Sequence, residues 1–257
     1  MDSGFYSSFT GFAERLSALE LVANNLANAS TTGFKAQREF YRSFNALLDS
    51  QTWATPPANM TQALDQTINQ FGVLGGSSTD NSQGTLQTTG NDTDVALEGS
   101  GYFAVLTANG VRYTRDGNFH LDRKRNLVTQ QGDQVLSAQP NQQLRPVQVP
   151  DGKLSVSGDG SVSVDGAYVS KLRLDDFPKG TALLQEGNNY LVAPAATAPV
   201  PSAAVVRQGM LESSNSDPVR STVALIDLQR TAQMMERALS IFNNDFNRTA
   251  AQDLPHV

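Results

Sequence analysis

The chain has 257 residues, no cysteine and two histidines, and its 19 basic and 25 acidic side chains give a formal net charge of −6. This length can form one large domain or two modest ones. The acidic balance argues against a nucleic-acid partner, which usually meets a basic face. The lack of an apolar run of about 18 residues argues against membrane insertion, and the first 21 residues lack the pattern of a standard secretory signal.

The same composition predicts no catalytic residue, no metal site and no cofactor. Without cysteine there is no disulfide, no thiolate nucleophile and no thiolate metal ligand. His120 and His256 are far apart in the chain, which leaves little room for a histidine-based site.

An amphipathic helix is predicted at the N-terminus, beginning at Asp2 or Ser3 and ending by Gly33. Its apolar residues alternate between spacings of four and three, the a/d pattern of a heptad. These positions are Phe5, Phe9, Phe12, Leu16, Leu19, Ala23 and Leu26.

A second helix with the same pattern is predicted near the C-terminus, from Asp217-Pro218 to about Arg248. Its a/d positions are Leu225, Leu228, Ala232, Met235, Leu239, Phe242 and Phe246. A narrow a/d stripe favours packing against another helix, so we expect the two termini to pair with each other and with neighbouring subunits. The alternative is that both helices pack on the middle of the chain.

The middle of the chain predicts an antiparallel β domain over residues 84–193. Short apolar strands there alternate with dipeptides that supply the positive φ of tight turns. These dipeptides are Asn109-Gly110, Asp116-Gly117, Asp151-Gly152, Asp159-Gly160 and Asp165-Gly166.

The predicted fold is therefore a mainly β central domain inserted between N- and C-terminal α-helices that form a coiled-coil-like axial core. An extended or irregular linker is expected between the first helix and the β domain, and a stiff Pro/Ala linker follows that domain. The expected segments are 1–44 (N-terminal helix and axial segment), 45–83 (extended or irregular linker), 84–193 (antiparallel β domain), 194–207 (Pro/Ala linker) and 208–257 (C-terminal axial helix).

Four blocks of the sequence, in the same order, closely resemble the bacterial flagellar rod and hook proteins. They are Ala23–Lys35, Gly84–Phe103, Tyr113–Phe119 and Gln208–Val219. The first block carries the family's N-terminal motif, with Asn24, Asn25, Leu26, Asn28, Thr32, Gly33, Phe34 and Lys35.

The residues of this motif also have a physical interpretation of their own. Gly33 can adopt the left-handed conformation that ends a helix, after which Phe34 can fold back onto the apolar stripe. The amides of Asn24, Asn25 and Asn28 can bond to backbone groups of adjacent chains. Alternatively, these asparagines face solvent near a fraying helix end.

The resemblance implies a structural subunit without an active site. Members of this family leave the cell through the flagellar type III export apparatus and assemble into a helical tube, with the terminal helices inside and the β domain outside. The expected place is the rod that crosses the periplasm, and the expected partners are other rod and hook subunits, copies of this chain and the export apparatus.

Several readings stay open on the sequence alone. We favour the proximal rod, because the chain is short for a hook protein and its block 225–232 departs from the distal rod pattern; the distal rod is the alternative within the family. A hypothesis from a different functional class is that the chain is a secreted β-domain binding protein or hydrolase whose helices merely dimerise.

Three smaller features of the sequence are candidate sites that have a simpler structural explanation. The pairs Asp175-Asp176 and Asp92/Asp94 offer carboxylates to a cation, although no calcium-loop spacing is present and solvated acidic loops are the commoner case. Gly99-Ser100-Gly101 predicts a turn before a strand rather than a phosphate loop. His120 is expected on a hairpin surface, and the sequence assigns no role to Trp53.

Overall fold

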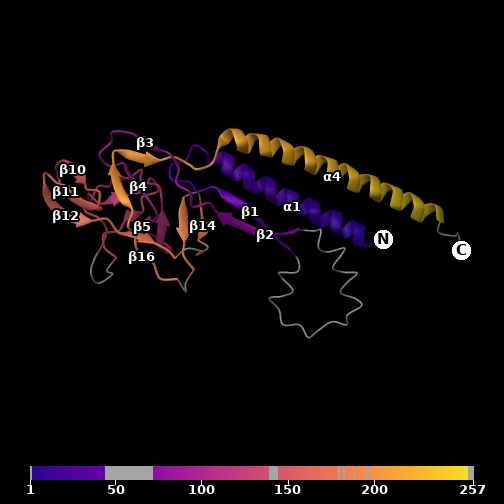
Figure 1. Ribbon diagram of the computed structural model, residues 1–257, viewed down its shortest axis with the longest axis horizontal. Coiled ribbons are helices and arrows are strands. Elements are labelled where there is room, and N and C mark those ends of the chain that lie inside the picture. Colours follow the sequence, from indigo (N-terminus) through magenta and orange to yellow (C-terminus); the bar gives the residue numbers. More distant parts are fainter. Residues whose placement is uncertain are drawn as a thin grey trace, which may run out of the picture. The chain divides into compact units, whose positions relative to one another are not determined.

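A computed structural model describes residues 2–43, 72–138, 144–178, 180–181, 183–187, 189–194 and 197–253. It confirms the predicted order of an N-terminal helix, a mainly β middle and a C-terminal helix (Figure 1). The chain divides into two compact units. The helical unit comprises Met1–Leu26, Gln37–Ser78 and Pro218–Val257, and the β unit comprises Ala27–Ala36 and Thr79–Asp217.

The helical unit contains two long helices and a pair of strands. Helix α1 runs over Asp2–Ala27 and helix α4 over Pro218–Asp253, each as one unbroken helix (Figure 1). Proline opens α4 as predicted, because the first helical position needs no N–H donor. Strands β1 (Gln37–Ser43) and β2 (Gly72–Thr79) form a two-stranded sheet, and β2 lies in the stretch that was expected to be an extended or irregular linker. Trp53 lies outside the described residues.

The β unit consists of short strands joined by turns. They are β3 (Leu86–Thr88), β4 (Val95–Glu98), β5 (Tyr102–Thr107), β6 (Gly110–Thr114), β7 (His120–Leu121), β8 (Leu127–Val128), β9 (Gln134–Val135), β10 (Leu154–Val156), β11 (Ser161–Val164), β12 (Ala167–Lys171), β13 (Leu174–Asp176), β14 (Leu184–Glu186), β15 (Tyr190–Val192), β16 (Val200–Pro201), β17 (Val205–Gln208) and β18 (Met210–Glu212).

Neighbouring strands of the β unit pair antiparallel, as the turn signals predicted. The largest sheet has the order β14-β15-β6-β5-β9-β8-β7, with β13 joined to β5 and β16 joined to β13. A three-stranded sheet has the order β10-β11-β12. Two further pairs, β4 with β17 and β3 with β18, join the beginning of the β unit to its end.

Two apolar clusters fill the β unit, and β5 separates them. Side chains alternate across a strand: Phe103 and Val105 enter the larger cluster, while Tyr102 and Ala104 enter the smaller one. All four residues are buried, which explains why this strand is a continuous apolar run rather than an alternating one.

The turn dipeptides do not all serve the same purpose. Asn109-Gly110 and Asp165-Gly166 join hairpin strands β5–β6 and β11–β12, and both glycines have positive φ. Gly117 differs, because a Cβ there would lie 1.5 Å from the carbonyl oxygen of Val95. Glycine is needed at that position for close backbone approach, so the Asp116-Gly117 pair is not a tight hairpin turn.

The Pro/Ala stretch 194–207 contributes strands of its own. Strand β16 within it pairs with β13, and β17, which begins in it, pairs with β4. Prolines interrupt donation by the outer edge of β16, which limits further strand addition there.

Candidate functional site

Three charged side chains from distant parts of the sequence meet inside the β unit. The Lys35 Nζ lies 2.5 Å from Glu212 Oε1, and the Arg115 Nη1 lies 3.1 Å from Glu212 Oε2. Their side chains are 4%, 4% and 0% exposed for Lys35, Arg115 and Glu212 respectively. We call these three residues the junction cluster, because Lys35 follows the first helix and Glu212 precedes the last.

The junction cluster is held by backbone groups as well. Glu212 Oε1 accepts a hydrogen bond from the Gly84 backbone N–H at 2.8 Å. Lys35 donates to the Ser82 carbonyl at 2.7 Å, and Arg115 donates to the Gly99 carbonyl at 2.6 Å. Buried charges need such partners, because an unpaired charge away from water is strongly destabilising.

Burial sets the electrostatics of this cluster. It lowers the pKa of Lys35 from its ordinary value, while the Glu212 carboxylate acts in the opposite direction. Two positive charges face one negative charge, so the cluster carries an excess of one positive charge. The Arg115 guanidinium also lies 5.4 Å from the centre of the Tyr102 ring, whose face attracts cations.

The motif residues before Lys35 bind the same region. Thr32 Oγ1 donates to Asp116 Oδ1 at 2.8 Å, and the Gly33 N–H donates to the Glu212 carbonyl at 2.7 Å. Gly33 has φ +67, and a Cβ there would lie 2.3 Å from the Asp116 backbone nitrogen. Glycine is therefore required twice, for its conformation and for space.

Asn215 joins this region to the chain that leads into α4. Its Oδ1 accepts from the Ala36 N–H at 2.7 Å, and its Nδ2 donates to the Asp80 carbonyl at 2.8 Å. Phe34, which is fully buried in the β unit, accepts a hydrogen bond from the Asn215 N–H. The segments next to both helices are thus fastened to one place on the β unit.

Asp116, which belongs to the β unit, holds the motif residue Thr32 by a hydrogen bond. It accepts from Thr32 Oγ1, from the Asn118 N–H and from Asn189 Nδ2. Burial raises the pKa of Asp116, and these three hydrogen bonds oppose the rise. The arrangement holds and positions chain segments, and a catalytic nucleophile is not part of it.

Comparison with known proteins identifies the family. The model for flagella basal body rod proteins matches residues 5–35, and the model for the D1 domain of flagellar hook proteins FlgE/F/G matches residues 96–164. The flagellar basal-body rod protein FlgF of Caulobacter vibrioides is 33% identical over 259 residues, which cover 96% of this chain and 98% of that protein. The chain belongs to the flagellar basal-body rod protein family. This family is structural rather than enzymatic.

Relatives with a second name are nearly as similar to this rod protein. The flagellar basal-body rod protein FlgG of Bacillus subtilis is 32% identical, with 91% of this chain and 93% of that protein covered. FlgG of Caulobacter vibrioides is 30% identical, with 90% and 92% covered. These identities leave the choice between the two kinds of rod protein open.

The structure places the predicted stripe of α1 at a partly buried surface. Phe12, Leu19, Ala23 and Leu26 are half-buried, and Leu16 is 42% exposed. Phe5 and Phe9 lie in α1, but their side chains are outside the described part. The pairing of this stripe with another helix stays a prediction.

The most buried residues of α1 lie on another face. Ala18 and Asn25 are nearly fully buried and stand two turns apart on one side of the helix. Asn25 Nδ2 donates to the Gln37 carbonyl at 2.8 Å, and its Oδ1 accepts from the Gln37 N–H at 2.9 Å. Asn25 thus makes within its own chain the backbone bonds that the sequence suggested between chains.

The remaining motif asparagines have different surroundings. Asn28 is buried, and its Oδ1 accepts from Thr31 Oγ1 at 3.3 Å. Asn24 is exposed on α1.

Helix α4 carries the predicted stripe as half-buried positions. They are Leu225, Leu228, Met235 and Leu239, with Ala232 fully buried. Phe242 and Phe246 lie in α4, but their side chains are outside the described part.

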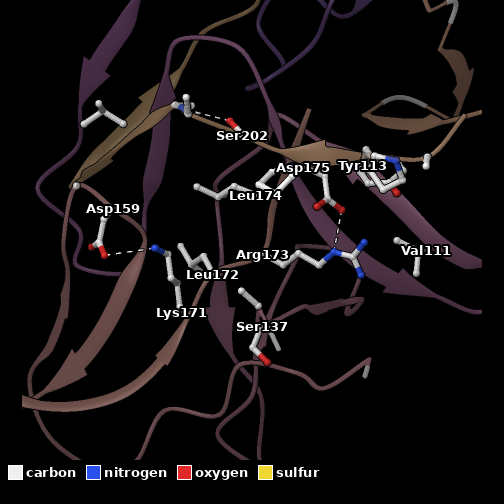
Figure 2. Close-up of a pocket in the computed structure, with 18 residues that line it drawn as sticks. Val111, Tyr113, Ser137, Asp159, Lys171, Leu172, Arg173, Leu174, Asp175 and Ser202 are labelled. Carbon is white, nitrogen blue, oxygen red and sulfur yellow. Dashed lines mark hydrogen bonds and ion pairs between the residues drawn. The ribbon is translucent and has the colours of Figure 1, made fainter. Parts of the chain in front are cut away.

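Three of the four carboxylates considered as cation ligands, those of Asp94, Asp175 and Asp176, have partners within the protein. Asp175 pairs with Arg173 at 2.8 Å beside a groove of the β unit, where Figure 2 shows the two side chains pointing at one another. Asp176 accepts from Ser100 Oγ, and Asp94 accepts from Thr89 and Asn91. Within the described ranges, the structure contains no group of three metal-ligating side chains. None of its described helices is both long and apolar enough to cross a membrane.

The junction cluster could not be recognised as a site in the sequence. Lys35 was singled out, but Arg115 and Glu212 stood in the resembling blocks without a role. The available signal was weak: Arg115 stands among other polar residues in Tyr113–Phe119, and only Glu212 directly follows an apolar pair, Met210-Leu211. The pairing of Arg115 with Glu212 across 97 residues depends on the tertiary fold.

Proposed function

We propose that this chain, a structural subunit of the flagellar basal-body rod, binds its neighbours through both faces of α4 and through the stripe of α1. In this proposal the junction cluster holds the segments next to the helices in a fixed conformation on the β unit. The axial helices can then meet neighbouring subunits without loosening the β domain.

A second apolar stripe on α4 carries this proposal. Besides the half-buried stripe, α4 exposes a second set of large apolar residues, and Val219 and Met234 are 72% and 62% exposed. At 3.6 residues per turn the two sets lie about 160° apart around the helix. The exposed set is Val219, Val223, Ile226, Met234 and Ile241.

One partner helix cannot cover two opposite faces, so α4 needs at least two apolar contacts. An exposed set of this size on one helix favours an interaction surface over a solvated face. Helix α4 has 36 residues and α1 has 26, so α4 exceeds α1 by roughly 15 Å. A helix of the length of α1 therefore cannot cover the whole of α4. Neighbouring rod subunits would supply the helices that cover the rest of α4.

We place this subunit in the proximal rod, with export through the flagellar type III apparatus and a position in the periplasm. The support is the departure of block 225–232 from the distal pattern and the resemblance itself. Tomography of basal bodies from cells lacking this chain tests the placement. Loss of the rod next to the membrane ring supports it, whereas a surviving proximal rod with loss of the distal rod and hook assigns the chain to the distal rod.

The assembly proposal is tested by Met234→Glu, with Gln233→Glu as the matched control. Both positions are exposed on α4, so neither substitution should change the circular dichroism or thermal unfolding of the purified chain. Met234→Glu should abolish swimming and yield no complete basal bodies, because a carboxylate would be buried at a subunit contact. Gln233→Glu should keep both. Motile cells with complete basal bodies in the Met234→Glu strain would refute the second-face contact.

The secreted binding protein or hydrolase with dimerising helices makes a different prediction. Limited proteolysis of the purified full chain should remove both ends of an axial subunit quickly, and leave a resistant core within the β unit. Ends that resist as long as the β unit would favour stably docked or dimerised helices.

A further inference from the structure

A small cavity of about 10 Å³ lies next to the junction cluster. Gly33 and Lys35 of the motif segment line one part of it, and Arg115, Asn189 and Tyr190 line another. A cavity needs roughly this volume to hold one water molecule. All of its walls belong to the β unit.

Two buried polar atoms of lining residues lack a hydrogen-bond partner. They are Arg115 Nε, an N–H donor, and Asn189 Oδ1, an acceptor. The Arg115 side chain is 4% exposed, so bulk water does not supply the missing acceptor. Buried polar groups are nearly always satisfied, which makes two such atoms around one cavity informative.

The orientation of the Asn189 amide is fixed by a neighbour. Asn189 Nδ2 donates to Asp116 Oδ2 at 3.1 Å. Reversing the amide would place its oxygen against this carboxylate oxygen, which cannot donate when ionised. The Asn189 Oδ1 acceptor is therefore correctly assigned as the oxygen that lacks a partner.

We propose that one buried water molecule binds in this cavity, accepting from Arg115 Nε and donating to Asn189 Oδ1. An anion would satisfy the guanidinium but not the amide oxygen, and a cation would satisfy the amide oxygen but cannot accept a hydrogen bond from Arg115 Nε. Water both accepts and donates, and it fits the volume. This proposal does not depend on the assembly role.

The water closes a ring of hydrogen bonds around the motif. Thr32 bonds to Asp116, Asp116 to Asn189, and Arg115 to Glu212, whose carbonyl accepts from Gly33. The water joins Asn189 to Arg115 and so links these two halves. Asn189, the residue preceding β15, thereby helps to hold the segment Thr32–Lys35, which follows α1.

A crystal structure of the full chain at a resolution that shows ordered water tests the site directly. The expected result is one electron-density peak within hydrogen-bond distance of Arg115 Nε and Asn189 Oδ1. Crystals grown with bromide, which replaces chloride and scatters anomalously, should show no anomalous signal at this position. An empty cavity, or a bromide peak in crystals grown with that ion, would overturn the proposal.

Nuclear magnetic resonance of the labelled full chain supplies a second readout. Arg115 Hε should show a cross-peak to long-lived water. Arg112 Nε bonds to Glu186 at 2.6 Å and serves as the control within the same spectrum, where no such cross-peak is expected. In Asn189→Leu the cross-peak should disappear and exchange of Arg115 Hε should accelerate about tenfold, as for one lost hydrogen bond to a charged group. An unchanged cross-peak in that variant would refute the role of Asn189.

Discussion

Replacing Glu212 by glutamine should destabilise the β unit strongly, although the side chain keeps its shape. The Glu212 carboxylate accepts from Lys35 at 2.5 Å, from the Gly84 N–H at 2.8 Å and from Arg115 at 3.1 Å. Glutamine removes the only negative charge of the junction cluster and leaves two buried positive charges facing each other. The glutamine amide nitrogen is also a hydrogen-bond donor, and it would face another N–H donor of the cluster where the carboxylate oxygen had accepted.

The magnitude follows from the cost of leaving a buried charge unpaired. Breaking a buried ion pair from one side costs about 3–5 kcal/mol. Lys35 limits the penalty, because burial already lowers its pKa and loss of Glu212 favours its neutral form further. For a unit of this size, 1 kcal/mol shifts the unfolding temperature by about 2–4 °C, so Glu212→Gln should lower it by about 6–20 °C.

Differential scanning calorimetry of the full chain measures this shift, with Glu98→Gln as the matched control. Glu98 pairs with Arg207 at 2.8 Å, but both side chains are about half exposed, so this change should cost at most about 1 kcal/mol. Adding Lys35→Met to Glu212→Gln should recover part of the loss, because one unpaired cation is removed. Equal unfolding temperatures for the Glu212→Gln and Glu98→Gln variants would refute the reasoning.

Three further predictions concern the motif and its support. Gly33→Ala should lower the free energy of unfolding, measured with denaturant, by about 2–4 kcal/mol, because alanine is strained at positive φ and its Cβ would clash with the backbone. Gly90→Ala is the control: Gly90 has φ +73 but open space around it, so this change should lower the free energy of unfolding by only about 1 kcal/mol. Asn25→Ala should speed hydrogen exchange at the Gln37 amide by about tenfold, since that N–H loses its acceptor; an unchanged rate would contradict the bond. Burial raises the pKa of Asp116 above its unfolded value of 3.8, so the folded state holds the proton more tightly. The Asp116 contribution to stability is thus greatest below pH 3.8 and falls as pH rises through the folded pKa, a slope that Asp116→Asn should remove from the pH profile.

Much of the fold could be predicted from local patterns alone. Heptad spacing identified both helices, and Pro218 marked the start of α4, because these signals depend on neighbouring residues within a few turns. Turn dipeptides such as Asp165-Gly166 identified an antiparallel domain, since positive φ is a local requirement. Gly33 has the left-handed conformation that was predicted, but α1 already ends at Ala27, so Gly33 does not end the helix. Its positive φ occurs instead where the chain lies against the backbone of Asp116.

Other features depended on which strands become neighbours. The sequence did not indicate that Gly117 packs against Val95, nor that β1 and β2 would pair across a long interval. It suggested partners in adjacent chains for Asn25, whose amide instead matches the backbone of Gln37, twelve residues further along the same chain. Hydrogen-bonding capacity is visible in a sequence, but the partner is not.

The sequence by itself determined the order of helix, β domain and helix, the apolar stripes of the helices and the resemblance to a rod family, because each is written in contiguous residues. Only the tertiary structure decided that Lys35, Arg115 and Glu212 share one buried site. Their charges come from segments up to 177 residues apart, and burial, which turns an ordinary ion pair into a strong structural constraint, exists only after the strands have packed around it.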